Sequence, residues 1–125
     1  MAERRPVIEE TFTFPWRTPP LSANHRMHWA VKARTTRDVR SATAWACRKF
    51  PDVERIEVSL VWVVGDKRRR DVDNIVPTLK AMCDGLVDVG IVDDDIPELM
   101  FKHMPVIRYE QGGTPRFELT IKEIA

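Results

Sequence analysis

Two groups of aspartates are the residues of this sequence whose type and spacing best suit chemistry. In the first group, Asp71 and Asp73 stand two positions apart, directly before a predicted helix. In an extended segment such a pair points to one side of the chain. Two neighbouring carboxylates repel each other, and a shared proton or a hard divalent cation relieves that repulsion. The pair therefore predicts a Mg²⁺ site, with Mn²⁺ as a substitute.

The second group is a run of three aspartates at 93–95, beyond that helix. A helix of about 14 residues is roughly 21 Å long, so the two groups meet only if the chain doubles back. A loop containing Gly90 permits this return, with Ile91 and Val92 as an apolar anchor. We expect Asp94 and Asp95 to complete the metal site, and which is the main ligand stays open. The alternative is an exposed acidic turn, with Asp73 acting only as a helix cap.

Phosphodiester hydrolysis is the reaction that such a site suits. In proteins Mg²⁺ keeps several waters and takes one or two carboxylates plus phosphate oxygens of the substrate. It neutralises the phosphate and lowers the pKa of a bound water. Lys80 lies seven residues after Asp73 and four before Asp84, so these three share one helix face. Lys80 is thus a candidate for stabilising the reacting phosphate, or else only a salt-bridge partner of Asp84.

Charge is distributed unevenly along the chain. Residues 1–70 hold 15 Lys and Arg against 8 Asp and Glu, a charge of +7, whereas residues 71–125 hold 5 against 11, a charge of −6. This asymmetry favours an anionic partner held by the basic half, although the two halves could simply neutralise each other. Arginines next to the acidic pair and on the outer face of the first helix are predicted to bind DNA phosphates. These are Arg68, Arg69, Arg70, Arg34 and Arg37.

Periodicity of apolar residues predicts the elements that position these side chains. We expect strands at 7–14, 56–64, 99–107 and 116–124, and helices at 34–50 and about 74–87. Asp73 or Asn74 is the expected N-cap of the second helix, and Pro77 is expected in its first turn. The order β-α-β-α-β-β indicates an α/β (α+β mixed) fold. We expect one domain over residues 1–125, with a mixed four-stranded sheet and two main helices.

The composition is typical of a globular protein and excludes several other classes. Hydrophobic residues make up 43% and charged residues 31% of the chain, which argues against a disordered or fibrous protein. No apolar run approaches the roughly 20 residues of a membrane span, and no export signal is recognised. Cys47 and Cys83 fall in apolar helical patterns, so buried free thiols are expected rather than a disulfide or a metal pair. A cytoplasmic location is therefore the expectation, with DNA association expected from the arginines named above.

Taken together, these motifs resemble the RusA family of Holliday junction resolvases, which are crossover junction endodeoxyribonucleases. The resemblance rests on the run from Arg68 to Asn74, followed by Lys80, Asp84 to Leu86, Gly90 and the Asp94-Asp95 pair. The stretch from Phe14 to Asn24 is similar to that family's Pro-rich N-terminal loop. Residues 102–105, 112–113 and 117–123 are similar to its last two strands. The resemblance thus covers nearly the whole chain.

This resemblance implies a homodimeric, Mg²⁺-dependent endonuclease that binds four-way DNA junctions and nicks two opposed strands symmetrically. It implies that Asp71, Asp73 and Asp95 are metal-binding catalytic aspartates, with Asp94 beside them. Lys80 would be the catalytic lysine, and Asn24 would join the arginines in contacting DNA. Two other functions stay open: a nuclease for other branched DNA such as forks and flaps, and a non-catalytic DNA-binding recombination accessory protein.

Overall fold

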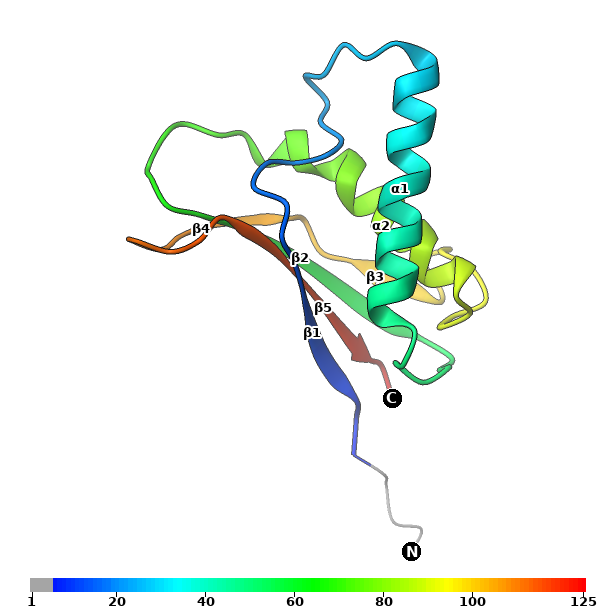
Figure 1. Ribbon diagram of the computed structural model, residues 1–125. Helices are drawn as coiled ribbons and strands as arrows, with labels where there is room; N and C mark the ends of the chain where they lie inside the picture. Colours follow the sequence, from blue (N-terminus) through cyan, green and yellow to red (C-terminus); the bar gives the residue numbers. More distant parts are fainter. Residues whose placement is uncertain (1–5) are drawn as a thin grey trace, which may run out of the picture.

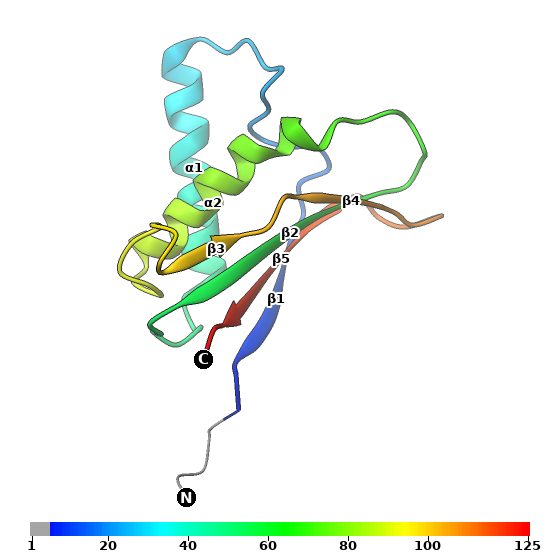
Figure 2. The same cartoon turned by 180° about the vertical axis from the view of Figure 1, so that it is seen from behind.

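Five strands form one mixed sheet, and both helices lie on the same side of it (Figures 1 and 2). The computed structural model describes residues 6–125. Its elements are β1 (Glu9–Phe14), α1 (Trp29–Cys47), β2 (Ile56–Val64), the 3₁₀ turn η1 (Val72–Ile75), α2 (Val76–Asp88), β3 (Met100–Lys102), β4 (Val106–Tyr109) and β5 (Arg116–Glu123). The expected mixed α/β fold with two main helices is confirmed. Neither helix of the described chain has the length and apolar content needed to cross a membrane.

The sheet has the order β1-β5-β2-β3, and β4 pairs with β2 on the same edge as β3. β5 is antiparallel to both β1 and β2, whereas β3 and β4 are parallel to β2. The prediction of one strand at 99–107, and hence of four strands, was wrong. Pro105 has no N–H to donate to a ladder, and the chain leaves the sheet at 103–105 before it pairs again.

Alternating side chains of the two central strands build the core. Ile56, Val58 and Leu60 of β2 are at most 1% exposed, and so are the inward residues of β5. Those residues are Phe117, Leu119 and Ile121, as the sequence predicts. The bounds of β2 also match the prediction, because its alternation begins at Ile56 and ends where Gly65 and Asp66 turn the chain.

Helix α1 begins five residues before the predicted start at Arg34 and ends three residues before the predicted end at Phe50. The early start was missed because the cap is unusual: Nδ1 of His28 accepts a hydrogen bond from the backbone N–H of Ala30 at 3.2 Å. The buried stripe of α1 runs through Val39, Thr43 and Cys47, which are spaced by one helical turn.

A close contact joins α1 to α2. Gly85 of α2 faces the backbone of Arg40 so tightly that an added Cβ would lie 2.5 Å from the Arg40 carbonyl oxygen. At the end of this contact Arg40 donates two hydrogen bonds to the carboxylate of Asp88, at 2.7 and 2.9 Å. These bonds lower the pKa of Asp88. Because the carboxylate is favoured in the folded state, this small stabilisation is present above the ordinary aspartate pKa and is lost as pH falls through the lowered pKa.

The two cysteines lie inside this helical layer. Cys47 and Cys83 are buried and free, which confirms the expectation from the sequence. Burial raises the pKa of each thiol to about 12, so both remain protonated and unreactive at neutral pH.

Candidate functional site

The entry to α2 differs from the predicted cap. Asp71, in extended conformation, accepts a hydrogen bond from the N–H of Asp73 at 3.0 Å and so caps η1. Asp73 already belongs to this 3₁₀ turn, and no side chain caps α2 itself. The prediction that Asp73 or Asn74 is the cap was therefore wrong, whereas Pro77 does lie in the first turn. Both carboxylates of the pair remain at the exposed start of the helix.

The return loop after α2 does double back, as the sequence permits. Gly90 adopts a positive φ of 84°, and Ile91 and Val92 beyond it are 1% and 2% exposed, so they anchor the loop. This anchor brings Asp95 beside the middle of α2, where its Oδ2 lies 4.0 Å from Nζ of Lys80. Nζ of Lys80 also lies 3.8 Å from Oδ1 of Asp84.

Lys102 of β3 is the member of this cluster that the sequence did not predict. Its Nζ donates a hydrogen bond to Oδ2 of Asp95 at 3.3 Å. This bond is the main reason that the pKa of Asp95 is lowered; desolvation opposes it, and the charges of Lys102 and Lys80 add to it. Alternation with the buried Met100 was the available signal, because residues 100 and 102 of a strand share one face.

Lys102→Met should raise the pKa of Asp95 toward the ordinary aspartate value, because the strongest interaction that favours the ionised carboxylate is removed. Lys80→Met should raise it less, since Lys80 acts only by its charge. The measurement is an NMR titration of the side-chain carboxyl carbon of Asp95. Lys122→Met, an exposed lysine of β5, is the matched control and should leave the titration unchanged. An unaltered titration in Lys102→Met would contradict this account.

The triple aspartate divides into residues with different surroundings. Asp93 and Asp94 are exposed, and Oδ1 of Asp94 accepts a hydrogen bond from the N–H of Asp95 at 2.7 Å. Asp94 therefore shapes the turn, while the side chain of Asp95 is 26% exposed and faces the two lysines. Between Asp94 and Asp95, it is Asp95 that the fold directs toward α2.

The donor set suits a hard cation, but it does not form a finished cage. Within residues 6–125, no three His, Cys, Asp or Glu side chains lie together in a group that could hold a metal ion. Asp71 and Asp73 stand at the start of the helix and Asp95 beside its middle. Mg²⁺ takes one or two carboxylates and completes its shell with water and substrate phosphate, so the Asp71–Asp73 pair has the number of carboxylates that it needs. The described residues thus offer a carboxylate pair and a separate aspartate rather than a formed metal site.

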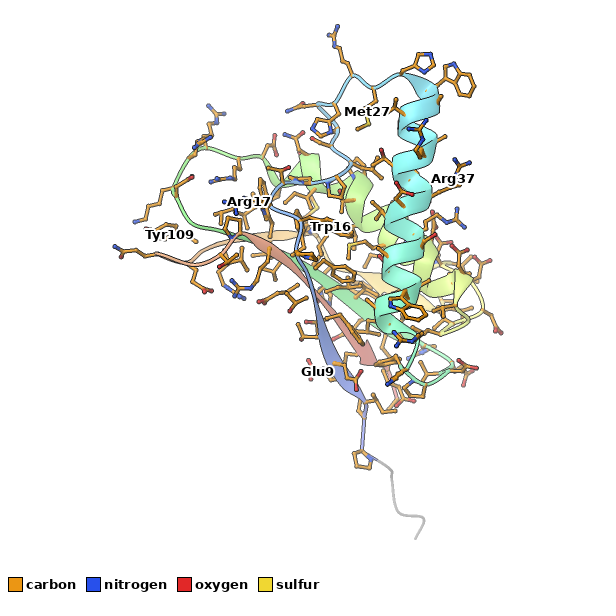
Figure 3. The ribbon with its side chains drawn as sticks, in the orientation of Figure 1. Glu9, Trp16, Arg17, Met27, Arg37 and Tyr109 are labelled. Carbon is orange, nitrogen blue, oxygen red and sulfur yellow. The ribbon has the colours of Figure 1, made fainter. Side chains whose placement is uncertain are left out.

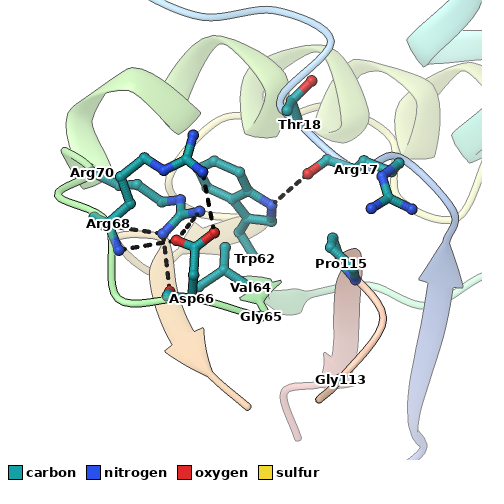
Figure 4. Close-up of a pocket in the computed structure, with 10 residues that line it drawn as sticks. All are labelled: Arg17, Thr18, Trp62, Val64, Gly65, Asp66, Arg68, Arg70, Gly113 and Pro115. Carbon is teal, nitrogen blue, oxygen red and sulfur yellow. Dashed lines mark hydrogen bonds and ion pairs between the residues drawn. The ribbon is translucent and has the colours of Figure 1, made fainter. Parts of the chain in front are cut away.

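The arginine run contributes one structural residue and two exposed ones. Figure 4 shows Arg70 turned inward, with Nη2 2.8 Å from Oδ1 of Asp66 and its guanidinium 5.1 Å from the ring centre of Trp62. Nη1 of Arg70 also donates to the backbone oxygens of residues 66 and 68. Arg70 thus braces the turn after β2, whereas Arg68 and Arg69 are exposed.

The remaining predicted DNA contacts lie on the surface. Arg34 and Arg37 are exposed on α1, and Figure 3 shows the side chain of Arg37 pointing away from the body of the protein. Asn24 is exposed in the N-terminal loop. The structure therefore leaves these three side chains accessible to a partner.

Comparison with known proteins gives little further information. No family model matches the chain. A protein of Xylella fastidiosa (strain Temecula1 / ATCC 700964), described only as uncharacterized, is 24% identical over 122 residues, which covers 92% of this chain and 77% of that protein.

Solved structures of the hydrogenase maturation protein HypE are distantly similar. The HypE–HypF complex matches at 10% identity and a TM-score of 0.38, covering 93% of this chain and 32% of that one. HypE in complex with ATP matches at 11% identity and a TM-score of 0.37, covering 100% of this chain and 32% of that chain. The chain thus spans about a third of these solved chains, and a similarity this weak carries no argument about function.

Proposed function

We propose that the protein is a Mg²⁺-dependent endonuclease that cuts branched DNA, with the four-way junction as its preferred substrate. One observation carries the proposal: the return loop brings Asp95 to Lys80 of α2, the helix whose entry holds Asp71 and Asp73. The exposed Arg68 and Arg69 directly precede that entry. The resemblance to RusA resolvases supplies the preference for junctions and the paired nicking of opposed strands.

Each group has a role that its surroundings support. Asp71, Asp73 and Asp95 would hold Mg²⁺, which when bound neutralises the phosphate and supplies a water of lowered pKa. Asp95 is ionised at neutral pH, as a ligand must be, and Lys102 lowers its pKa further. Lys80 is 67% exposed, so its ammonium group can reach a phosphate oxygen while it stays close to Asp95. Arg68 and Arg69 bind the phosphates that flank the cut.

Paired nicking of two strands requires two sites, so the proposal includes a homodimer. A two-fold symmetric dimer presents its two sites to the two opposed strands of a junction. Sedimentation of the protein at the concentration used for cleavage should show a dimer, and a monomer under those conditions would contradict this part of the proposal.

Incubation with synthetic four-way junctions and Mg²⁺ should give symmetric nicks in two opposed strands. Competition among junctions, forks, flaps and linear duplex should favour the junction. Equal cleavage of forks or flaps would instead indicate a broader nuclease for branched DNA. Absence of nicking with both Mg²⁺ and Mn²⁺, by protein that binds the junction, would overturn the proposal.

A non-catalytic DNA-binding recombination accessory protein is the second candidate. The observation that favours it is that the described residues contain no ready three-ligand metal group. Under this alternative, Asp71→Asn leaves junction binding unchanged or strengthens it, and no divalent ion produces a nick.

A further inference from the structure

A cavity of about 360 Å³ lies between the N-terminal loop, α1 and the first turns of α2. Its volume falls at the lower end of the roughly 300–1,000 Å³ typical of small-molecule pockets. Apolar side chains contribute much of its lining: Leu21, Met27, Pro77 and Ala81. Figure 3 shows Met27 on the loop that leads into α1. The cavity therefore offers an apolar surface to a flat, small ligand.

Buried hydrogen bonds fix the loop wall of this cavity. Thr78 of α2 is fully buried, and its hydroxyl donates to the carbonyl oxygen of Leu21 at 2.6 Å. The same hydroxyl accepts from the N–H of Leu21 at 3.1 Å. The N–H of Ala23 adds a bond to the carbonyl oxygen of Asn74 at 3.4 Å. Because these bonds hold the loop to the helix, the cavity exists before any ligand binds.

The polar lining is suited to an anionic ligand that carries hydrogen-bonding edges. Lys32 and Lys80 both line the cavity, and Asp84 is the single acidic residue among its lining residues. Ser22 and Thr36 supply hydroxyl groups. This combination of apolar surface, hydroxyls and ammonium groups matches a base joined to a phosphate, because the base faces need apolar contact and the backbone needs cations.

A second, smaller depression adjoins the cavity near the start of α2. It has a volume of about 190 Å³ and shares Ser22 and His25 with the larger cavity. Its other lining residues include Arg69 and Asp71. A strand whose phosphate lies by Asp71 would thus pass His25 and reach the larger cavity with its next nucleotide.

We infer that the larger cavity receives an unstacked nucleobase of the bound DNA, next to the phosphate that Mg²⁺ at Asp71 would hold. This inference rests on the proposed function, because it assigns a part of the same substrate to a neighbouring subsite. Bases that are already unpaired are the least costly to unstack, so this subsite favours DNA that presents an unpaired base over linear duplex DNA.

Two methionines provide the probe and its control within one sample. With ¹³C-methyl methionine, a short single-stranded oligodeoxynucleotide added without divalent metal should shift the methyl resonance of Met27. The resonance of Met104, 53% exposed and outside the cavity lining, should stay unchanged. An abasic oligomer of the same length binds through its phosphates and should leave Met27 unshifted. Equal shifts with both oligomers, or no shift of Met27 at saturating oligonucleotide, would overturn the inference.

A filled cavity provides the second measurement. Thr36→Phe places an aromatic ring in the cavity from α1, and the hydroxyl that it removes donates within that helix to the carbonyl oxygen of Lys32. It should abolish the Met27 response and reduce junction nicking at least several-fold. Ala33→Phe, exposed on the same helix and outside the cavity, is the matched control. Junction nicking that is equal in Thr36→Phe and wild type would overturn the base subsite while leaving the proposed nuclease intact. Conversely, a Met27 shift without any nicking would support the subsite and count against the nuclease.

Discussion

Asp73→Asn should reduce junction nicking in Mg²⁺ by about 100-fold or more while junction binding is retained. The change removes one negative charge from the metal site but keeps the size of the side chain. Loss of one group that stabilises the transition state typically costs about 100- to 1,000-fold in rate, which is about 2.7–4 kcal/mol. Binding should be equal or tighter, because a carboxylate that repels phosphate is gone.

The measurement is single-turnover cleavage of a junction, with binding determined separately without metal. Asp52→Asn is the matched control, since Asp52 is an exposed aspartate in the loop between α1 and β2. The control should nick at the wild-type rate. If Asp73→Asn also nicks at that rate, Asp73 is only a residue of the 3₁₀ turn, and the proposed metal site loses its central ligand.

Gly85→Ala should lower the free energy of unfolding by about 2 kcal/mol. Alanine is a better helix former than glycine by about 1 kcal/mol, so an exposed helical position would respond in the opposite direction. At Gly85 the added Cβ lies 2.5 Å from the Arg40 carbonyl oxygen and 3.1 Å from Cβ of Thr43. Because the nearest atom belongs to the backbone, no side-chain rotation relieves the contact, and the two helices must move apart.

Urea unfolding with an unchanged slope would measure this effect. Ser41→Ala, on the exposed part of α1, is the control and should change stability by at most about 0.5 kcal/mol. An equally stable or more stable Gly85→Ala would show that the helices separate without cost. If they do separate, the walls of the cavity beside Lys80 also move, so nicking should fall together with stability.

Regular periodicity explains which parts of the fold the sequence predicted. The alternation in β2 and β5 is long, so every second residue from Ile56 to Leu60 and from Phe117 to Ile121 could be assigned to the core. The prediction of a single strand at 99–107 was wrong because the chain there forms two strands, which are only three and four residues long. A single proline can interrupt so short a segment, and no periodicity spans the break.

The sequence showed that the chain could return after α2, because Gly90 and the apolar pair beyond it permit a turn. It did not show where the return would end: Asp95 comes to Lys80, and within the described residues it forms no three-residue group with Asp71 and Asp73 that could hold a metal ion. The roles of Lys102 and Arg70 depend on tertiary partners instead. Lys102 reaches Asp95 only through pairing of β3 with β2, and Arg70 turns inward only because Asp66 and Trp62 lie beneath it.

The central position of β5 in the sheet determines when the protein can fold during synthesis. β5 ends at Glu123, yet it lies between β1 and β2, and Glu9 pairs with Lys122. Until β5 has been synthesised, β1 has no partner strand and the edge of β2 that β5 covers stays open. Such pairings between distant parts of a chain are formed slowly. A chain interrupted before β5 therefore exposes two unpaired strand edges that invite aggregation.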